Sequence, residues 1–196
     1  MRKGGNRVRI TAQLIDALGG THLWADRFDG SLEDVFELQD SVAISVAGVI
    51  EPTLQAAEVR RSAARPIKDL SAYDLYLRAL PHQFSFGTDR NTLVIDLLGQ
   101  AIERDRHYGP ALALAAFFHA QLDVNGRTDD REATQRTAID FARRALRVAR
   151  DDPEVLGPGA FVLGWYGEDI DVAVGLIDRC LDLNPSFARG WYWSAV

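Results

Sequence analysis

Acidic residues occur as two adjacent pairs in this sequence of 196 residues, and paired carboxylates are a residue type that general acid–base catalysis uses. The pairs are Asp129 with Asp130 and Asp151 with Asp152. Each pair stands just before a segment with helical periodicity, where an Asp carboxylate can accept hydrogen bonds from the free N–H groups of the first turn. We interpret both pairs as turn and capping residues, and we predict no catalytic residues.

The residue types that bind metals or act as nucleophiles are dispersed along the chain. None of the four histidines has the short spacing that brings two imidazoles to one metal ion: His22, His82, His107 and His119. The single cysteine, Cys180, cannot form an internal disulfide, and its sequence context favours a small buried side chain. The glycine pairs at 4–5 and 19–20 fit turns and match no phosphate-binding fingerprint. We predict no metal site and no cofactor.

The composition excludes two classes of partner. The hydrophobic content of 47% is enough for a real core, and the formal net charge of −6 argues against nucleic acid, which attracts clustered Lys and Arg. The N-terminus lacks the apolar segment of a signal peptide, and the longest apolar runs, 42–50 and 111–118, are far shorter than the ~18 residues of a membrane span. We therefore expect a soluble, cytoplasmic protein.

Alternating apolar residues predict a β-hairpin over residues 7–28. The first strand places Val8, Ile10, Ala12 and Leu14 on one face, and a turn-rich segment at 16–20 follows. The second strand, 21–28, has two candidate inner faces, one with Leu23, Ala25 and Arg27 and one with His22, Trp24, Asp26 and Phe28. A lone hairpin is marginal in water, so this one needs a further element to pack against.

A long helix is predicted to follow the hairpin. Ser31, with Asp34 three residues later, fits an N-cap, and apolar residues then recur at three- and four-residue spacing to about Ile50. Pro52 lacks an N–H group, so we expect a kink or a break there before the helical pattern resumes as far as Val59. Residues 63–69 are predicted to be a linker.

From residue 70 onward, the pattern is helical throughout. We predict helices over 70–80, 91–104, 110–122, 132–150, 154–166 and 170–183, and a further helix beginning near Trp191. Three of these helices carry two small or short side chains seven residues apart: Val94 and Ala101, Ala138 and Ala145, Ala173 and Cys180. Small residues at these places let neighbouring helices approach closely. The interval 101–145 is longer than the interval 145–180, which indicates an insertion around residues 123–130 and 148–151.

This recurring pattern, a helix with a small pair followed by a turn and a new helix, resembles the tetratricopeptide repeat. The N-terminal segments 5–17, 22–29 and 34–40 resemble the end of the TolB-like amino-terminal α/β domain, which stands between a class III adenylate or guanylate cyclase domain and such repeats in bacterial signalling proteins. The resemblance implies a mainly α fold: the tail of the TolB-like domain at 1–62, a linker at 63–69, and at 70–196 an α-solenoid of about three antiparallel helix pairs plus a truncated helix.

The resemblance also implies a function. We expect a non-catalytic protein-interaction module in signal transduction, attached to a nucleotide cyclase; the alternatives are a part of an adenylate cyclase polypeptide, or the sensor half of a winged-helix transcriptional regulator. In stacked helix pairs, the first helices line a groove for a peptide or a partner helix. The repeat phase projects seven residues towards that groove: Asp74, Arg78, Phe117, Gln121, Trp165, Arg189 and Tyr192. Core packing is the alternative for Phe117 and Trp165. An exposed terminal helix bearing Trp191 and Trp193 would allow self-association.

Overall fold

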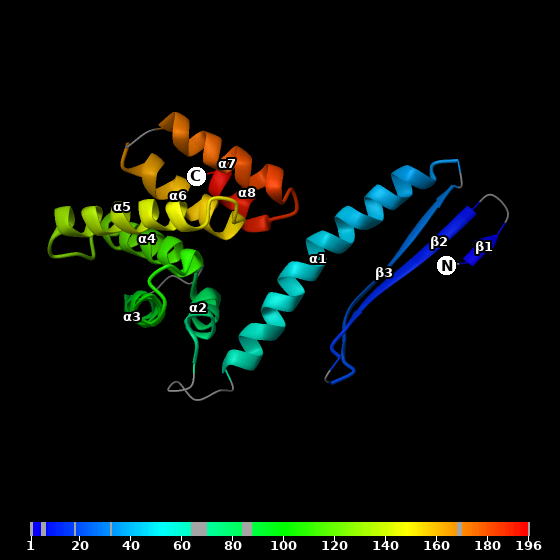
Figure 1. The fold of residues 1–196 in the computed structure, drawn as a ribbon, viewed down its shortest axis with the longest axis horizontal. Helices are drawn as coiled ribbons and strands as arrows, with labels where there is room; N and C mark the ends of the chain where they lie inside the picture. Colours follow the sequence, from blue (N-terminus) through cyan, green and yellow to red (C-terminus); the bar gives the residue numbers. More distant parts are fainter. Residues whose placement is uncertain are drawn as a thin grey trace. The chain divides into compact units, whose positions relative to one another are not determined.

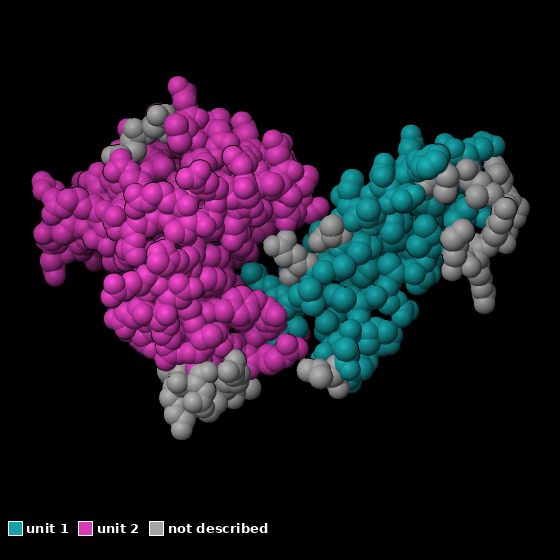
Figure 2. All heavy atoms as spheres, viewed as in Figure 1, with its two compact units in different colours: residues 1–57 teal, residues 58–196 magenta. Residues whose placement is uncertain are grey.

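The computed structural model describes residues 2–4, 7–17, 19–31, 33–63, 70–83, 88–167 and 170–195. These residues are mainly helical, with an antiparallel β-hairpin ahead of the helices, as the sequence predicts (Figure 1). The chain divides into two compact units, residues 1–57 and 58–196 (Figure 2). Of the predicted linker, residues 64–69 lie outside the described residues, and Ala63 ends a helix.

The first unit contains a small antiparallel sheet of β1 (Arg2–Gly4), β2 (Arg7–Ile15) and β3 (His22–Ser31), in that order. Ile10 lies opposite Phe28, and Leu14 lies opposite Trp24. Of the two candidate inner faces of β3, the one that shares a side with the apolar residues of β2 is therefore the face with Trp24 and Phe28. The sequence reasoning did not predict β1.

Helix α1 (Val35–Ala63) follows the sheet. It runs through Pro52 without a break, so of the two predicted alternatives, a kink or a break, the break is wrong. Proline removes one backbone hydrogen bond there, and the turns on both sides keep the helix intact. Ser31 is not the N-cap. It ends β3, and its Oγ accepts a hydrogen bond from the Glu33 N–H at 3.2 Å. Leu38 of α1 lies so close to Gly30 that a Cβ there would stand 2.8 Å from the leucine Cδ2.

The second unit contains the last turn of α1 and a series of helices in pairs. Their bounds are α2 (Ala72–Ala79), the short 3-10 helix η2 (Leu80–His82), α3 (Thr88–Arg104), α4 (Gly109–Val124), α5 (Arg131–Val148), α6 (Pro153–Trp165), α7 (Ile170–Leu183) and α8 (Ala188–Ser194). Each α-helix corresponds to a predicted helix with ends within a few residues, whereas the sequence reasoning did not predict η2. Between the predicted helices 70–80 and 91–104 the sequence also favours a loop at 84–90. Residues 84–87 of it lie outside the described residues, and residues 88–90 belong to α3.

The small pairs are buried, as their repeat phase requires. Val94 and Ala101 of α3, Ala138 and Ala145 of α5, and Ala173 and Cys180 of α7 have side chains at most 7% exposed. Ala145 shares a core cluster with Leu112 of α4 and Val155 of α6, and Cys180 shares one with Leu156 of α6. The second helix of a pair thus packs against the first helix of its own pair, and α5 packs in addition against α6.

The adjacent aspartates serve the helix ends, as the sequence predicts. Asp130 caps α5 by accepting a hydrogen bond from the Ala133 N–H at 2.9 Å, and Asp152 caps α6 through the Glu154 N–H, also at 2.9 Å. Their neighbour Asp151 forms an ion pair with Arg179. Burial raises the pKa of Asp152.

Helix α8 corrects one expectation. Trp191 is 56% exposed, as predicted, but Trp193 is 3% exposed and lies in the core. Its ring stands 4.7 Å from that of Phe117 in α4 and 5.5 Å from that of Phe161 in α6, measured between centroids. The prediction of an exposed Trp193 is wrong because α8 lies against α6 over a glycine, Gly157, which leaves space for the indole.

Candidate partner-binding groove

Asp74 and Arg78, two of the predicted groove residues, hold α2 in place. Asp74 is 7% exposed and completes a capping box with Ser71, whose backbone N–H donates to its carboxylate at 2.9 Å. Arg78 is half-buried, and its Nη2 donates to the backbone oxygen of Ser62 at 2.7 Å. The Ser62 hydroxyl in turn donates to the Asp74 backbone oxygen at 2.9 Å. Both side chains are used inside the fold.

Phe117 and Gln121 come from α4 and do not present a binding surface together. Phe117 is 2% exposed and packs in the core, which was the alternative expectation for it. Its ring is in edge contact with the rings of Phe118, Phe161 and Trp193. Gln121 is half-buried near the end of α4, where its backbone and side-chain oxygens accept hydrogen bonds from Asn125 Nδ2 at 2.6 and 3.0 Å.

Arg189 belongs to a buried polar cluster that joins three helices. It forms an ion pair with Glu154 of α6, in which the two side chains are 17% and 15% exposed. The Tyr76 hydroxyl of α2 donates to the other Glu154 oxygen at 3.1 Å, and Arg189 Nη1 donates to Gln83 Oε1 at 3.4 Å. Burial raises the pKa of Tyr76. This cluster stabilises the position of α8 and leaves Arg189 little surface for a partner.

Trp165 and Tyr192 are the two predicted groove residues whose side chains are exposed, at 52% and 39%. Trp165 stacks on Phe161 with ring centroids 5.9 Å apart and planes inclined by 19°. Tyr192 touches Trp193 edge-on, with centroids 5.0 Å apart. The core-packing alternative therefore does not apply to Trp165.

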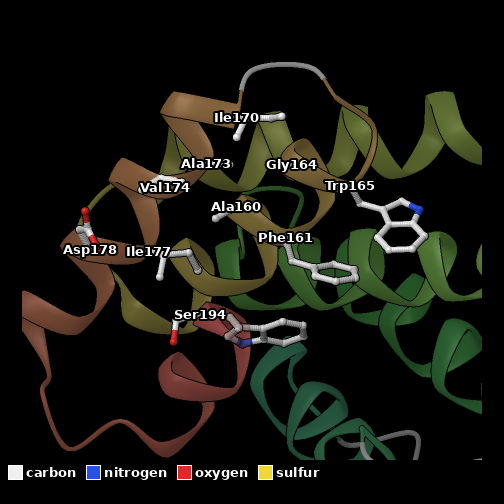
Figure 3. A pocket seen from close by; sticks show the side chains of 11 residues that line it. Ala160, Phe161, Gly164, Trp165, Ile170, Ala173, Val174, Ile177, Asp178 and Ser194 are labelled. Atoms are coloured by element: carbon white, nitrogen blue, oxygen red, sulfur yellow. The ribbon is translucent and has the colours of Figure 1, made fainter. Parts of the chain in front are cut away.

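Trp165 borders an apolar groove between α6 and α7, which is closed at one end by α8 (Figure 3). Its volume is about 480 Å³. The residues that line it, which define the α6–α7 groove, are Ala160, Phe161, Gly164, Trp165, Ile170, Ala173, Val174, Ile177, Asp178, Trp193 and Ser194. Phe161 and Trp165 project on one side, and Val174 and Ile177 on the other. Such a surface can bind apolar side chains and has one carboxylate at its edge.

The sequence reasoning found Trp165 but missed the α7 side of this groove. In α7 it considered only the small pair, Ala173 and Cys180. A second row on the same helix was available as a signal: Ile170, Val174 and Ile177 recur at helical spacing and add a further apolar face. A helix with apolar residues on two faces is expected to have two neighbours.

A smaller cavity of about 340 Å³ lies on the other side of Trp165 and has a polar wall. Asp123 is buried there, accepts from Arg131 Nε at 2.7 Å and accepts from the Tyr166 hydroxyl at 3.1 Å. Burial, together with this hydrogen bond, raises the pKa of Tyr166 to about 12. Because its carboxylate already has these partners, Asp123 is a structural acid that holds the α4–α5 turn against α6.

The remaining residue types with reactive chemistry are engaged in packing. Cys180 is fully buried, its Sγ donates to the Pro153 backbone oxygen at 3.5 Å, and burial raises its pKa to about 11. Burial also lowers the pKa of His119, whose ring lies 5.7 Å from that of Phe141. Among the described residues, no three His, Cys, Asp or Glu side chains are grouped so that they could hold a metal ion.

Across the described ranges, every helix is too short or too polar to cross a membrane. No protein-family model matches the chain. The chain is 33% identical over 175 residues to a protein of Rhizobium meliloti (strain 1021) named "Putative adenylate cyclase 3". The similar region covers 84% of this chain and 28% of the relative, so the chain spans little more than a quarter of the length of the relative that it matches.

Proposed function

We propose that this chain is a non-catalytic protein-interaction and regulatory module of a bacterial signalling protein, attached to a nucleotide cyclase. The observation that carries the proposal is the similarity to the R. meliloti protein, whose name assigns it to the adenylate cyclases and of which this chain matches 28%. A match of that extent fits a module within a larger enzyme. The same similarity favours a nucleotide cyclase over a winged-helix transcriptional regulator as the larger protein to which this chain belongs.

The non-catalytic role is supported by what the chemically capable residues do. Asp130 and Asp152 accept hydrogen bonds at helix N-termini, and Cys180 is a buried thiol with a raised pKa. A thiol of this kind is a poor nucleophile, because the thiolate is the reactive form. In the working protein, these groups stabilise helix ends and helix seams.

The fold that we propose for the second unit is a tetratricopeptide-type solenoid, and the first unit is then the tail of a TolB-like domain. The support is the recurrence of buried small pairs on α3, α5 and α7, together with the packing of α4 against α6 and of α6 against α8. Stacked pairs of this type provide extended surfaces for protein partners. A single buried cysteine suits a reducing, cytoplasmic environment.

The test uses the R. meliloti relative as the enzyme. Cyclic AMP production is measured for the intact relative, for a form that lacks the segment homologous to this chain, and for a chimera that carries this chain in its place. We expect the deletion to keep cyclase activity while its rate or its response to cell extract changes severalfold, and we expect the chimera to restore it. Equal output from all three forms would refute a regulatory role.

A second measurement addresses the alternative that this chain itself forms part of the catalytic machinery. The isolated chain is incubated with ATP and Mg²⁺ or Mn²⁺, and cyclic AMP is quantified against a buffer blank. We expect output equal to the blank. Cyclic AMP formed in proportion to the concentration of the isolated chain would overturn the non-catalytic assignment.

A further inference from the structure

Three arginines of α5 lie on the outer side of that helix, and we call them the arginine stripe. Arg136, Arg143 and Arg147 are spaced by seven and four residues, and all three are exposed. Since each residue turns an α-helix by about 100°, they share one narrow face, opposite the buried pair Ala138 and Ala145. The helices that follow α5 along the chain pack on its buried side, so this face stays open.

Helix α7 carries three aspartates at the equivalent positions, and we call them the aspartate stripe. Aligning the small pair of α5 with the small pair of α7 places each arginine of the arginine stripe on one of Asp171, Asp178 and Asp182. These aspartates are exposed and lie opposite the buried pair Ala173 and Cys180. The two stripes therefore have the same spacing and opposite charge.

Helices α5 and α7 are neighbours within the second unit. They run in the same direction, and α6 returns between them (Figure 1). Leu176 of α7 packs against the cluster that contains Ala138 and Ala142 of α5, and Arg179 of α7 forms an ion pair with Asp151, just beyond the end of α5. Because the small pairs of both helices face inward, the two stripes face outward on the same side of the unit.

The acidic residue between the arginines does not spoil this match. Asp140 lies between Arg136 and Arg143 and forms an ion pair with Arg144. Its equivalent in α7 is Gly175, where a Cβ has no heavy atom within 4 Å. An α5 face laid on an α7 face therefore brings Asp140 against open space and not against another carboxylate.

A second copy of the chain offers both stripes at once. A twofold axis parallel to α5 and α7 keeps the direction of the helices and exchanges their lateral order, so that α5 of each copy faces α7 of the other. The arginine stripe of each copy then meets the aspartate stripe of the other in register, once on each side of the axis. An unrelated partner would have to reproduce both patterns, and a second copy has them already.

We propose that two copies of this chain associate through the outer faces of α5 and α7, with the arginine stripe of each copy against the aspartate stripe of the other. Exposed ion pairs are weak individually and are screened by salt, so the association is weak and salt-dependent. Charge complementarity of this kind mainly specifies which faces meet and how they are aligned. The inference goes beyond the proposed function and does not depend on cyclase activity.

The test is sedimentation equilibrium of the full chain at concentrations up to about 1 mM, which detects weak dimers. We expect the average mass to rise with concentration towards that of a dimer. Raising the salt concentration from about 50 mM to about 500 mM should weaken the association at least about threefold.

Two charge-reversed variants locate the contact. The acidic variant combines Arg143→Asp with Arg147→Asp, and the basic variant combines Asp178→Arg with Asp182→Arg. Each variant alone has two stripes of like charge, so its self-association should be at least about tenfold weaker. An equal mixture of the two should recover the original affinity within about threefold, because every stripe then meets its opposite. Circular dichroism melts establish that each variant is folded.

A control variant separates this contact from a general effect of net charge. Asp40→Arg combined with Asp129→Arg changes the net charge as much as the basic variant does, at exposed positions outside both stripes. It should associate with itself within about twofold of the original chain. Mixed with the acidic variant, it should not recover the original affinity, because one of the two contacts then joins stripes of like charge.

Three results would overturn the proposal. The first is a chain that stays monomeric up to about 1 mM at about 50 mM salt. The second is association that both charge-reversed variants retain, which would place the contact elsewhere, for example around the exposed Trp191. The third is a mixture of the two variants that associates no better than either alone. Recovery in the mixture, together with loss in each variant, supports the paired stripes whatever the cyclic AMP measurements give.

Discussion

Replacing Gly157 by alanine probes how α8 is attached to the rest of the molecule. A Cβ built at this position stands 2.3 Å from Cδ1 of Trp193 and 3.0 Å from its Cγ. Since carbon atoms in contact are about 3.5–4.0 Å apart, the indole has to retreat by more than 1 Å. The indole is 3% exposed and enclosed by the rings of Phe117 and Phe161, so overpacking should cost about 1–3 kcal/mol.

An opposing effect has to be separated from that cost. Alanine is favoured over glycine inside a helix by about 1 kcal/mol, so Gly157→Ala gains that amount while it loses packing. Gly175 of α7 provides the matched control, because a Cβ there has no heavy atom within 4 Å. Gly175→Ala should therefore stabilise the protein by about 1 kcal/mol. The difference between the two alanine variants contains the steric cost of about 1–3 kcal/mol and the strain of a helical alanine before proline, because Gly157 directly precedes Pro158 inside α6.

The assay is thermal and urea unfolding followed by circular dichroism at 222 nm. For a protein of this size, 1 kcal/mol corresponds to about 2–4 °C, so Gly157→Ala should melt several degrees below Gly175→Ala. The same pair is then compared in a Trp193→Ala background, which removes the indole Cδ1 and Cγ that the new Cβ would meet. Among the described residues, the Trp193 Nε1 has no hydrogen-bond partner, so this replacement removes ring volume without breaking a hydrogen bond. We expect the difference to shrink by the steric cost of about 1–3 kcal/mol and to leave only the strain before Pro158.

Equal stability of Gly157→Ala and Gly175→Ala would refute the described packing of α8, because the added methyl group would then have met no indole. A difference of the same size in the Trp193→Ala background would also refute it, since the cost would then lie with another group.

Four further predictions test other contacts. Ala145→Leu, at a fully buried seam position, should cost about 1–3 kcal/mol in urea unfolding, because the seam has no room for a larger side chain. Arg189→Met should cost about 2–4 kcal/mol, since the buried carboxylate of Glu154 loses its cation, and a second change, Glu154→Gln, should recover part of that loss. His119 has a pKa lowered by burial, so its contribution to stability is complete above the unfolded pKa of about 6.5 and is lost as the pH falls through the lower folded pKa; His119→Leu should flatten the decline in urea midpoint between pH 7.5 and 5. Cys180, with a pKa of about 11, should react with a thiol reagent at pH 8 at least about a hundredfold more slowly in the folded protein than in urea.

Each of these expectations has a contrary result. Unchanged stability of Ala145→Leu would mean that the repeat phase is displaced. A double variant of Arg189 and Glu154 that is no more stable than Arg189→Met would mean that the lost stability is packing by the long side chain and not an unpaired carboxylate. A pH slope that His119→Leu leaves unchanged would assign the decline to other groups, and rapid labelling of native Cys180 would place the thiol at the surface.

The helices could be predicted from the sequence because their signals are local. Helix α7 has the predicted bounds, Ile170–Leu183, since apolar periodicity and the turn at Asn184 and Pro185 both limit it. The caps at Asp130 and Asp152 were predictable for the same reason, because an N-cap acts within its own first turn. The inner face of β2 followed from its alternation.

What the sequence did not predict depends on residues that are distant along the chain. The inner face of β3 was decided by its register with β2, and the register cannot be derived from one strand alone. Trp193 looked exposed because nothing nearby in sequence indicates Gly157, Phe117 or Phe161 as its neighbours. Pro52 carries a strong local signal that the surrounding helix overrides, since intact turns on both sides outweigh one missing hydrogen bond.

The groove was half predictable for a related reason. Trp165 could be projected from the phase of the first helices, but projecting Asp74 and Arg189 towards a partner ignored their partners inside the fold. A capping box and an ion pair with Glu154 use up the hydrogen-bonding capacity of those two side chains. The repeat phase predicts the side of the helix on which a residue lies, whereas the neighbouring helices determine whether that side is exposed.

The buried cluster around Arg189 has a consequence for how this protein unfolds. In an ordinary array of helix pairs, contacts are confined to neighbours, and an end pair can fray while the others remain folded. Here Tyr76 bonds to a residue 78 positions away and Gln83 to one 106 positions away. Opening α8 therefore removes the bond from Arg189 to Gln83, near the beginning of the second unit, and the ion pair of Arg189 with Glu154, to which Tyr76 is bonded. We therefore expect the helices of the second unit to unfold together, and displacement of α8 to weaken the hold on α2.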